Sequence, residues 1–360
     1  MPDEMYRDEA YRVRLEVNLG GLRMKNPVTV ASGTFASGRE YAELWETTLH
    51  ARQELSAGSA VNTGQGLRTE QTLRAGSAIN TGQGLLDPPG LFALGAVTTK
   101  GVSYEPWPGN ATPRITETAS GMLNAIGLQN KGVEAFCADD LAWLAARACG
   151  LPVIVNVCGH TVDEFAPVIN RLEREPNVSA YELNISCPNL DCGGMALGVV
   201  PETAAAVTSS CRALTSRPVI VKLTPNVIDI TEVARAVEAA GADAISLINT
   251  LAGMAINPYT RKPILARGAG GLSGPAIKPV ALLAVHRCYK AVRIPLLGMG
   301  GIQNASDAIE FILAGATAVA VGTANFSAPL TALYLARDIE GWCLEQGVSD
   351  IRELIGGLDA

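Results

Sequence analysis

Short, nearly continuous apolar runs recur along the chain, with polar or helical patterns between them. Eight of these runs are rich in β-branched residues and too short for helices, as in VIVNV and TAVAVG. Strands of this kind belong to parallel sheets that are buried on both faces. We therefore predict eight strands, over residues 27–31, 95–99, 152–157, 181–186, 218–223, 243–249, 294–298 and 317–322.

Helical patterns fill the intervals between the predicted strands. Residues 231–240 carry apolar side chains at spacings of three and four, which predicts an amphipathic helix. Thr231 is a candidate cap for its start, and Gly241 stands where a left-handed residue often ends a helix. Eight strands alternating with helices indicate the α/β class and a single (β/α)8 (TIM) barrel. A doubly wound open sheet is the alternative, but no GxGxxG motif follows the first strand.

Residues 43–92 break this alternation. AGSAVNTGQGL at 57–67 returns as AGSAINTGQGL at 75–85, and two copies are too few for a solenoid. We predict one barrel domain over residues 1–360, with 43–92 as a Gly/Ser-rich insertion between strands one and two.

Charge and composition narrow the choice of partners. The net charge is −7 and there is no Lys/Arg block, which argues against nucleic-acid or anionic-membrane binding. No run of 18 apolar residues occurs, and the first residues lack the apolar core of a signal peptide. The eight Cys form no CxxC pair and the three His are scattered, so we expect reduced thiols, a cytoplasmic protein and no metal site.

Polar residues cluster where the predicted strands end. In a (β/α)8 barrel the active site is built from these carboxyl ends. Taken in strand order, they are Ser32, Lys100, Asn156, Cys187, Lys222, Asn249 with Thr250, the GMGG run at 298–301, and Gly322 with Thr323.

The last two ends predict a phosphate site. Gly300 and Gly301 let backbone amides approach an anion, and the helix after Gln303 points its amino end toward them. A third Gly-rich stretch, RGAGGLSGP at 267–275, precedes another helix. Together these loops suit a phosphorylated cofactor across the barrel mouth, although Gly turns without a ligand are the simpler alternative.

Several longer motifs of this sequence resemble those of a known enzyme family. ELNISCPN (182–189), followed by GGMALG (193–198), resembles the catalytic loop of dihydroorotate dehydrogenases. Further matches, in order, are ASGTF (31–35), TTKGV (98–102), NAIGLQN (124–130), VKLTPNV (221–227), INTLAG (248–253), GGLSGPAIKPVAL (270–282), GMGGI (298–302) and AVGTANF (320–326). They cover roughly residues 14–345 without the insertion, and the last four are most similar to the class 1B catalytic subunit, which passes electrons to NAD.

The resemblance implies an FMN enzyme that oxidises (S)-dihydroorotate to orotate in de novo pyrimidine (UMP) biosynthesis. Cys187 would take the C5 proton while a hydride passes from C6 to flavin N5. A free thiol has a pKa of about 8.5, so a Cys can act as a base near neutrality where its surroundings favour the thiolate. Cys192 is not part of the motif, and we hypothesise that it forms a disulfide with Cys187 on oxidation.

The resemblance also implies which residues bind. Lys222 would lie by the flavin N1–O2 edge, where negative charge develops on reduction. The implied substrate-binding residues are Lys100, Asn124, Ala125, Ile126, Gly127, Leu128, Asn184, Asn189, Asn249 and Thr250. The implied cofactor-binding residues are Ala31, Ser32, Gly33, Lys100, Gly101, Asn156, Asn184, Lys222, Ile248, Gly274, Gly300, Gly301, Gly322 and Thr323.

Partners and alternatives follow from the same resemblance. The chain has no FAD or iron–sulfur signature, so reduction of NAD needs a second subunit with FAD and a 2Fe-2S cluster, and a homodimer of catalytic chains within a heterotetramer is expected. Three alternatives stay open: a class 1A-like enzyme that uses fumarate, the FMN domain of a dihydropyrimidine dehydrogenase, and a non-redox phosphate-binding barrel.

Overall fold

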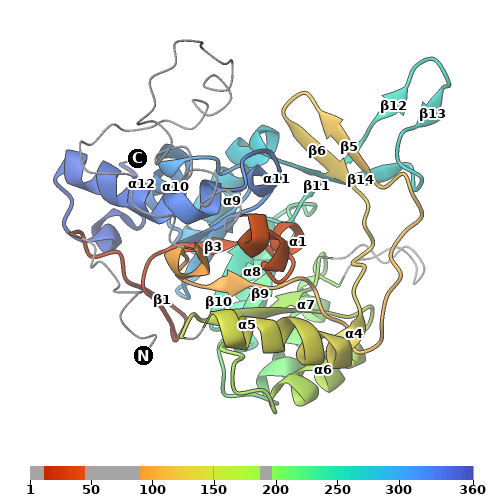
Figure 1. Cartoon of the computed structure of the whole chain (residues 1–360), viewed down its shortest axis with the longest axis horizontal. Helices are drawn as coiled ribbons and strands as arrows, with labels where there is room; N and C mark the ends of the chain where they lie inside the picture. The colour runs from red at the N-terminus through yellow and green to blue at the C-terminus, as the bar shows by residue number, and fades with distance from the viewer. Residues whose placement is uncertain (1–11, 45–89, 149, 187–196, 360) are drawn as a thin grey trace, which may run out of the picture.

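The computed structural model describes residues 12–44, 90–148, 150–186 and 197–359. Its centre is a parallel sheet with the strand order β3-β16-β15-β10-β9-β8-β7-β4 (Figure 1). Its strands are β3 (Val28–Val30), β4 (Val97–Thr98), β7 (Val153–Cys158), β8 (Ala180–Asn184), β9 (Val219–Lys222), β10 (Ala244–Leu247), β15 (Leu296–Met299) and β16 (Ala318–Val321). All eight predicted strands are confirmed, with ends that differ by no more than a few residues.

The two outer strands of this sheet, β3 and β4, meet and nearly close the barrel. The Gly95 amide donates to the Val28 carbonyl at 2.8 Å, and the hydroxyls of Thr29 and Thr98 share a hydrogen bond at 3.2 Å. Gly95 is required here because a Cβ on it would lie 1.9 Å from the Asn26 carbonyl oxygen. The (β/α)8 barrel is therefore confirmed, and the open doubly wound sheet is excluded.

Helices cover the outside of the barrel (Figure 1). In α6 the residues Phe165, Val168, Ile169 and Leu172 are buried at spacings of three and four, so this helix packs one apolar stripe on the sheet. The longer helices are α5 (Ala142–Arg147), α6 (Phe165–Leu172), α7 (Pro201–Arg212), α8 (Ile230–Ala239), α9 (Lys278–Ala291), α10 (Ala305–Leu313) and α12 (Thr331–Gln346). The shorter helical segments are α1 (Ser32–Phe35), η1 (Gly90–Ala93), α4 (Gly132–Ala135), η2 (Phe136–Leu141), η3 (Val162–Glu164), η5 (Pro275–Ile277), α11 (Ala324–Ser327) and η6 (Ile351–Leu354).

Helix α8 matches the predicted helix, but its cap differs. The Asp229 side chain accepts a hydrogen bond from the Thr231 amide, so Asp229 is the N-cap and the expected cap, Thr231, lies inside the helix. Gly241 follows the last turn with φ +96°, as expected for the residue that ends a helix.

An antiparallel sheet, which the sequence reading missed, lies to one side of the barrel (Figure 1). Its strands, in order, are β11 (Leu251–Met254), β14 (Ala269–Ser273), β6 (Gly121–Asn124) and β5 (Ile115–Thr118). A hairpin of β12 (Ile256–Asn257) and β13 (Lys262–Pro263) projects beyond it. The Gly-rich stretch around 268–274 is thus mostly a strand, and the expectation of a simple loop there is wrong except at Gly268 and Gly274, whose φ values are positive.

A second hairpin, of β1 (Val17–Leu19) and β2 (Leu22–Met24), lies at the opposite end of the barrel. A Cβ on Gly20 in its turn would lie 2.2 Å from the carbonyl oxygen of Asp243, which directly precedes β10. This hairpin therefore packs where the barrel strands begin, and the ends that carry chemistry face away from it.

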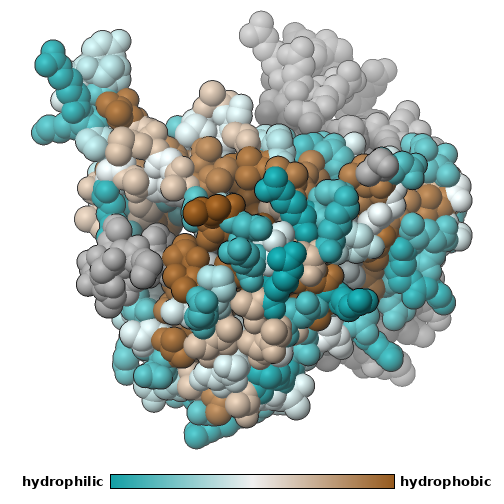
Figure 2. Space-filling view, turned by 180° about the vertical axis from the view of Figure 1, so that it is seen from behind, coloured by the Kyte–Doolittle hydropathy of each residue, from teal (hydrophilic) through white to brown (hydrophobic). Residues whose placement is uncertain are grey.

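The outer surface mixes polar and apolar side chains. Figure 2 shows this mixture on the face opposite to that of Figure 1, with the β12–β13 hairpin standing out at one corner. In the described ranges, no helix has both the length and the apolar character needed to cross a membrane. Nearly all of the predicted insertion, residues 45–89, lies outside the described residues, so its nature remains a prediction.

Candidate active site

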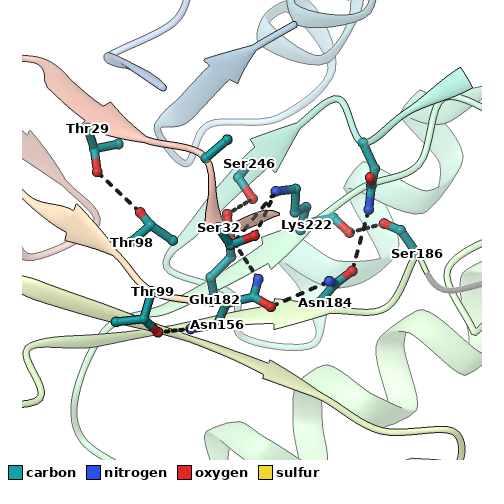
Figure 3. Close-up of polar contacts among 12 residues, drawn as sticks. Thr29, Ser32, Thr98, Thr99, Asn156, Glu182, Asn184, Ser186, Lys222 and Ser246 are labelled. Atoms are coloured by element: carbon teal, nitrogen blue, oxygen red, sulfur yellow. Dashed lines mark hydrogen bonds and ion pairs between the residues drawn. The ribbon is translucent and has the colours of Figure 1, made fainter. Parts of the chain in front are cut away.

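A layer of polar side chains lies inside the barrel, where β7, β8, β9 and β10 run side by side (Figure 3). In β8 and the residues after it, Glu182, Asn184 and Ser186 alternate with the apolar Leu183 and Ile185. Successive residues of a strand point to opposite faces, so these three polar side chains share one face. That face is the barrel interior, since their partners are on β7, β9 and β10.

Lys222, the last residue of β9, lies within this layer. Its ammonium is 3.4 Å from the Ser32 hydroxyl and 3.7 Å from the Glu182 carboxylate, and only 7% of the side chain is exposed. A Lys is seldom so buried without an ion pair, and Glu182 supplies that pair. Ser32 comes from α1, directly after the first barrel strand, so strands one, four and five converge on one ammonium.

Three Asn side chains form a chain of hydrogen bonds across the neighbouring strands. Asn249 donates to Asn184 at 3.5 Å, and Asn184 donates to Asn156 at 3.4 Å. Asn156 in turn donates to Glu182 at 2.5 Å. The structure therefore brings Ser32, Asn156, Lys222 and Asn249, whose places at strand ends predicted their proximity, into one connected group with Asn184.

Lys100, just after β4, is a second cation at this end of the barrel. Burial lowers the pKa of its ammonium, the nearby Cys158 raises it, and the positive charges of Arg114 and Lys222 lower it further. Among the described side chains, none accepts a hydrogen bond from Lys100 or forms an ion pair with it. An anion beside Lys100 would therefore be stabilised by the positive charges of Lys100 and Lys222.

The loop after β6 lies against this part of the barrel. A Cβ on Gly101 would be 2.9 Å from the Asn156 side-chain oxygen and 3.9 Å from the Leu128 side chain. Leu128 has a positive φ of +50°, an uncommon backbone state for a residue with a Cβ. Within the predicted substrate-binding run of Ala125, Ile126, Gly127 and Leu128, it is Leu128 that the structure brings beside Gly101.

Two further predicted substrate residues meet on β14. The Asn124 side chain donates to the Gly271 carbonyl at 3.4 Å, and a Cβ on Gly271 would lie 2.0 Å from the Thr250 hydroxyl. Gly271 was expected only as part of a Gly-rich stretch suited to a phosphorylated cofactor. In the structure it lies instead against Asn124 and Thr250, and its lack of a side chain lets the backbone approach both.

The predicted phosphate residues gather at the ends of β15 and β16. A Cβ on Gly301 would lie 3.0 Å from the Gly274 carbonyl oxygen, and one on Gly274 would lie 3.6 Å from the Thr323 methyl group. Thr323 donates to Ser273 at 2.8 Å. Among the described residues, none accepts a hydrogen bond from the backbone amides of Gly300, Gly301 or Thr323, which leaves these amides available to an anion.

The group of Gly274, Gly300, Gly301 and Thr323 is called the cradle below. The remaining predicted cofactor-binding residues lie beside it. The Ala31 amide donates to the Val321 carbonyl at 2.8 Å, and a Cβ on Gly322 would lie 3.6 Å from that of Ala31. Ile248 lies beside Gly300, and Gly33 has open space on its side-chain face.

The amino end of helix α10 was expected to point at the phosphate. Some of the backbone amides there already donate hydrogen bonds to side chains of the protein. The Asn304 side chain accepts from the Asp307 amide, and Asp307 accepts from the Gln303 amide and pairs with Lys278. The Gly loops, more than this helix end, are left to offer free amides.

Cys187 and Asn189 lie outside the described residues, so the structure does not place the predicted base. The five described Cys are all buried: Cys137, Cys158, Cys211, Cys288 and Cys343. Burial raises the pKa of Cys211 and Cys288 to about 12, as expected for inert structural thiols.

Glu182 and its hydrogen-bond donor Ser246 are the main residues that the sequence reading missed. Glu182 is fully buried, and Ser246 donates to it at 2.8 Å. The signal was available, because a charged residue inside an otherwise apolar strand requires a buried partner.

A (β/α)8 barrel whose mouth combines the cations Lys100 and Lys222, a run of amide side chains and backbone amides without described acceptors has the chemistry of an enzyme site for small polar or anionic ligands. Comparison with known proteins narrows this class. The family model described as dihydroorotate dehydrogenase matches residues 71–341, and the chain belongs to the dihydroorotate dehydrogenase family. Membership of this family implies a flavin cofactor.

Several relatives carry the same name, "Dihydroorotate dehydrogenase B (NAD(+)), catalytic subunit". The protein of Trichlorobacter lovleyi is 46% identical over 96% of this chain and 98% of its own length. That of Alkaliphilus oremlandii is 46% identical over 96% of this chain and 99% of its own. The Lachnoclostridium phytofermentans protein is 47% identical over 94% and 98%.

Proposed function

We propose that this chain is the FMN-containing catalytic subunit of an NAD-linked dihydroorotate dehydrogenase, and that it oxidises (S)-dihydroorotate to orotate in pyrimidine biosynthesis. The observation that carries the proposal is the convergence of Lys100 and Lys222 with the Asn chain at the barrel mouth, in a member of this family. The partner subunit follows from the relatives' name, which makes each of them one subunit of a larger enzyme.

The described residues fit FMN. Its phosphate would be held by the free amides of Gly300, Gly301 and Thr323, with Gly274 and Gly322 leaving space beside them. Its ring system would lie toward Lys222 and Lys100, with Ala31, Ser32, Gly33, Gly101, Asn156, Asn184 and Ile248 around it. FMN supplies the acceptor for the hydride that leaves C6 of the substrate.

The substrate is an anion with amide edges, and the mouth offers groups of the matching chemistry. Lys100 would pair with the carboxylate, because its ammonium is buried and has no described partner. Asn124, Asn184 and Asn249, with Thr250 and the undescribed Asn189, would bind the ring amides, since a side-chain amide both donates and accepts. The loop of Ala125, Ile126, Gly127 and Leu128 would cover one side of the ring.

The reaction removes one proton and one hydride, which together are two protons and two electrons, from the adjacent carbons C5 and C6. The Cys187 thiolate takes the C5 proton, the hydride leaves C6, and the electron pair of the broken C5–H bond forms the C5=C6 double bond of orotate. Lys222 would stabilise negative charge at the edge of the flavin that faces it.

The test is a measurement on the purified chain. Its released cofactor should have the mass of FMN, and dihydroorotate should reduce it whereas dihydrouracil should not. NAD should be reduced only when a partner subunit with FAD and a 2Fe-2S cluster is added. Rapid turnover of the single chain with fumarate would instead indicate a class 1A-like enzyme, and a chain that binds no flavin would contradict the proposal.

A further inference from the structure

Glu182 has no role in the proposed function, yet it occupies the centre of the polar layer. Its carboxylate is fully buried and accepts hydrogen bonds from Ser246 at 2.8 Å and from Asn156 at 2.5 Å. The Lys222 ammonium lies 3.7 Å from the same oxygen that Asn156 contacts (Figure 3).

Strand register fixes this arrangement. Asn156 lies opposite Glu182 in the β7–β8 pairing, and Ser246 lies opposite Lys222 in the β9–β10 pairing. Two donated hydrogen bonds and a nearby ammonium all stabilise the ionised carboxylate. The four side chains therefore belong to four adjacent strands that cannot shift without breaking the barrel.

Stability alone is a poor reason for such a pair. A buried ion pair loses its hydration, and an apolar pair of similar volume is often as stable. The distance of 3.7 Å between the Lys222 ammonium and the Glu182 carboxylate is also longer than a direct hydrogen bond. The closest contacts of Glu182 are its hydrogen bonds with Asn156 and Ser246. Glu182 thus offsets the charge of Lys222 without binding the ammonium closely.

The ammonium retains capacity for a ligand. It has three N–H donors, and the described residues within reach are Ser32 at 3.4 Å and Glu182 at 3.7 Å. Both contacts hold the ammonium near the strand ends, where a flavin ring edge can take a further donor.

We propose that Glu182 is a positioning residue that acts through Lys222. It keeps the ammonium near the flavin edge and offsets part of its positive charge, and this charge offset lowers the reduction potential of bound FMN. This inference rests on the proposed function. A lower potential favours the passage of electrons from the flavin to an NAD-linked acceptor, whereas an uncompensated Lys222 would stabilise the reduced flavin.

The test is the FMN reduction potential in Glu182→Gln. Gln has the same shape, and its oxygen can accept from Asn156 while its amide donates to the Ser246 oxygen, so mainly the charge is lost. We expect the ratio of FMN dissociation constants, oxidised over reduced, to rise at least about tenfold, which is about 30 mV for a two-electron couple. A matched control is Glu173→Gln, which removes the same charge beside Tyr181 at the other end of β8, and its potential should equal that of the wild type.

The outcomes separate the two proposals. If wild type and control bind FMN and are reduced by dihydroorotate, a Glu182→Gln potential equal to theirs overturns the inference and leaves the function standing. A wild-type chain that binds no FMN overturns both.

A conservative variant covers the case in which Glu182→Gln does not fold with FMN. Glu182→Asp keeps the charge but draws it away from Lys222, so its potential should rise by less than tenfold. A potential identical to that of the wild type in this variant would overturn the inference.

Discussion

The Lys222 ammonium lies 3.7 Å from the Glu182 carboxylate inside the barrel, and both side chains are almost fully buried. One charge comes from β9 and the other from the adjacent β8, so the pair connects these two strands inside the barrel. The pair places a cation at the mouth without leaving an isolated charge in the core.

Loss of one partner should therefore destabilise the fold. Lys222→Met leaves Glu182 buried without its counter-charge, which should lower the free energy of unfolding by about 3–5 kcal/mol. The double variant Lys222→Met/Glu182→Gln removes both charges and should recover most of that loss. Urea unfolding of the flavin-free chains measures this, and equal stabilities of the single and double variants would count against the pair.

The cradle at the ends of β15 and β16 should lose FMN when a side chain is introduced. Gly301→Ala places a Cβ 2.8 Å from the Lys278 Cβ at φ +86°, beside the amides proposed to hold phosphate. FMN affinity should fall by at least about tenfold, or 1.4 kcal/mol.

Gly347→Ala is the matched control. Gly347 also has positive φ, +69°, but no atom lies within 4 Å of its Cβ position. Both variants should lose about 1–2 kcal/mol of stability from backbone strain, and Gly301→Ala should lose more because of its close contact with Lys278. Gly301→Ala alone should lose FMN affinity in a fluorescence titration. A similar loss of affinity in both variants would refute the cradle.

The lowered pKa of Lys100 predicts how product binding depends on pH. Orotate binds as a carboxylate and favours the charged ammonium, so its affinity should fall as the pH rises through the Lys100 pKa. Because burial lowers that pKa below its usual 10.5, the fall should begin below that value. Orotate titrations of Lys100→Met should show weak binding without this pH dependence, and an unchanged alkaline fall would contradict the role of Lys100.

The barrel could be predicted from the sequence because each of its strands is buried on both faces. A run such as VIVNV is then apolar almost throughout, and its identity is decided locally. The antiparallel sheet could not be predicted in this way. Its strand β14 includes Gly270 and Gly271, which disfavour strands, and Gly271 pairs with Asn124, 147 residues earlier in the chain.

The site could be predicted in part for a related reason. Lys100, Lys222 and Asn249 follow or end strands, and the carboxyl ends of barrel strands converge whatever the loops do. Glu182 was missed because it lies two residues before Asn184 within the strand, where only contacts to other strands explain a charge. The place of Cys187 remains a prediction.

The most direct test is anaerobic reduction of the bound flavin by dihydroorotate, followed by its visible absorbance. The account predicts rapid bleaching in the wild type and a loss of about 100-fold or more in Cys187→Ala, with FMN still bound, because a positioned base contributes about 10²–10⁴-fold. Equal bleaching rates in the two proteins, or no bleaching of a flavin-loaded wild type, would contradict it.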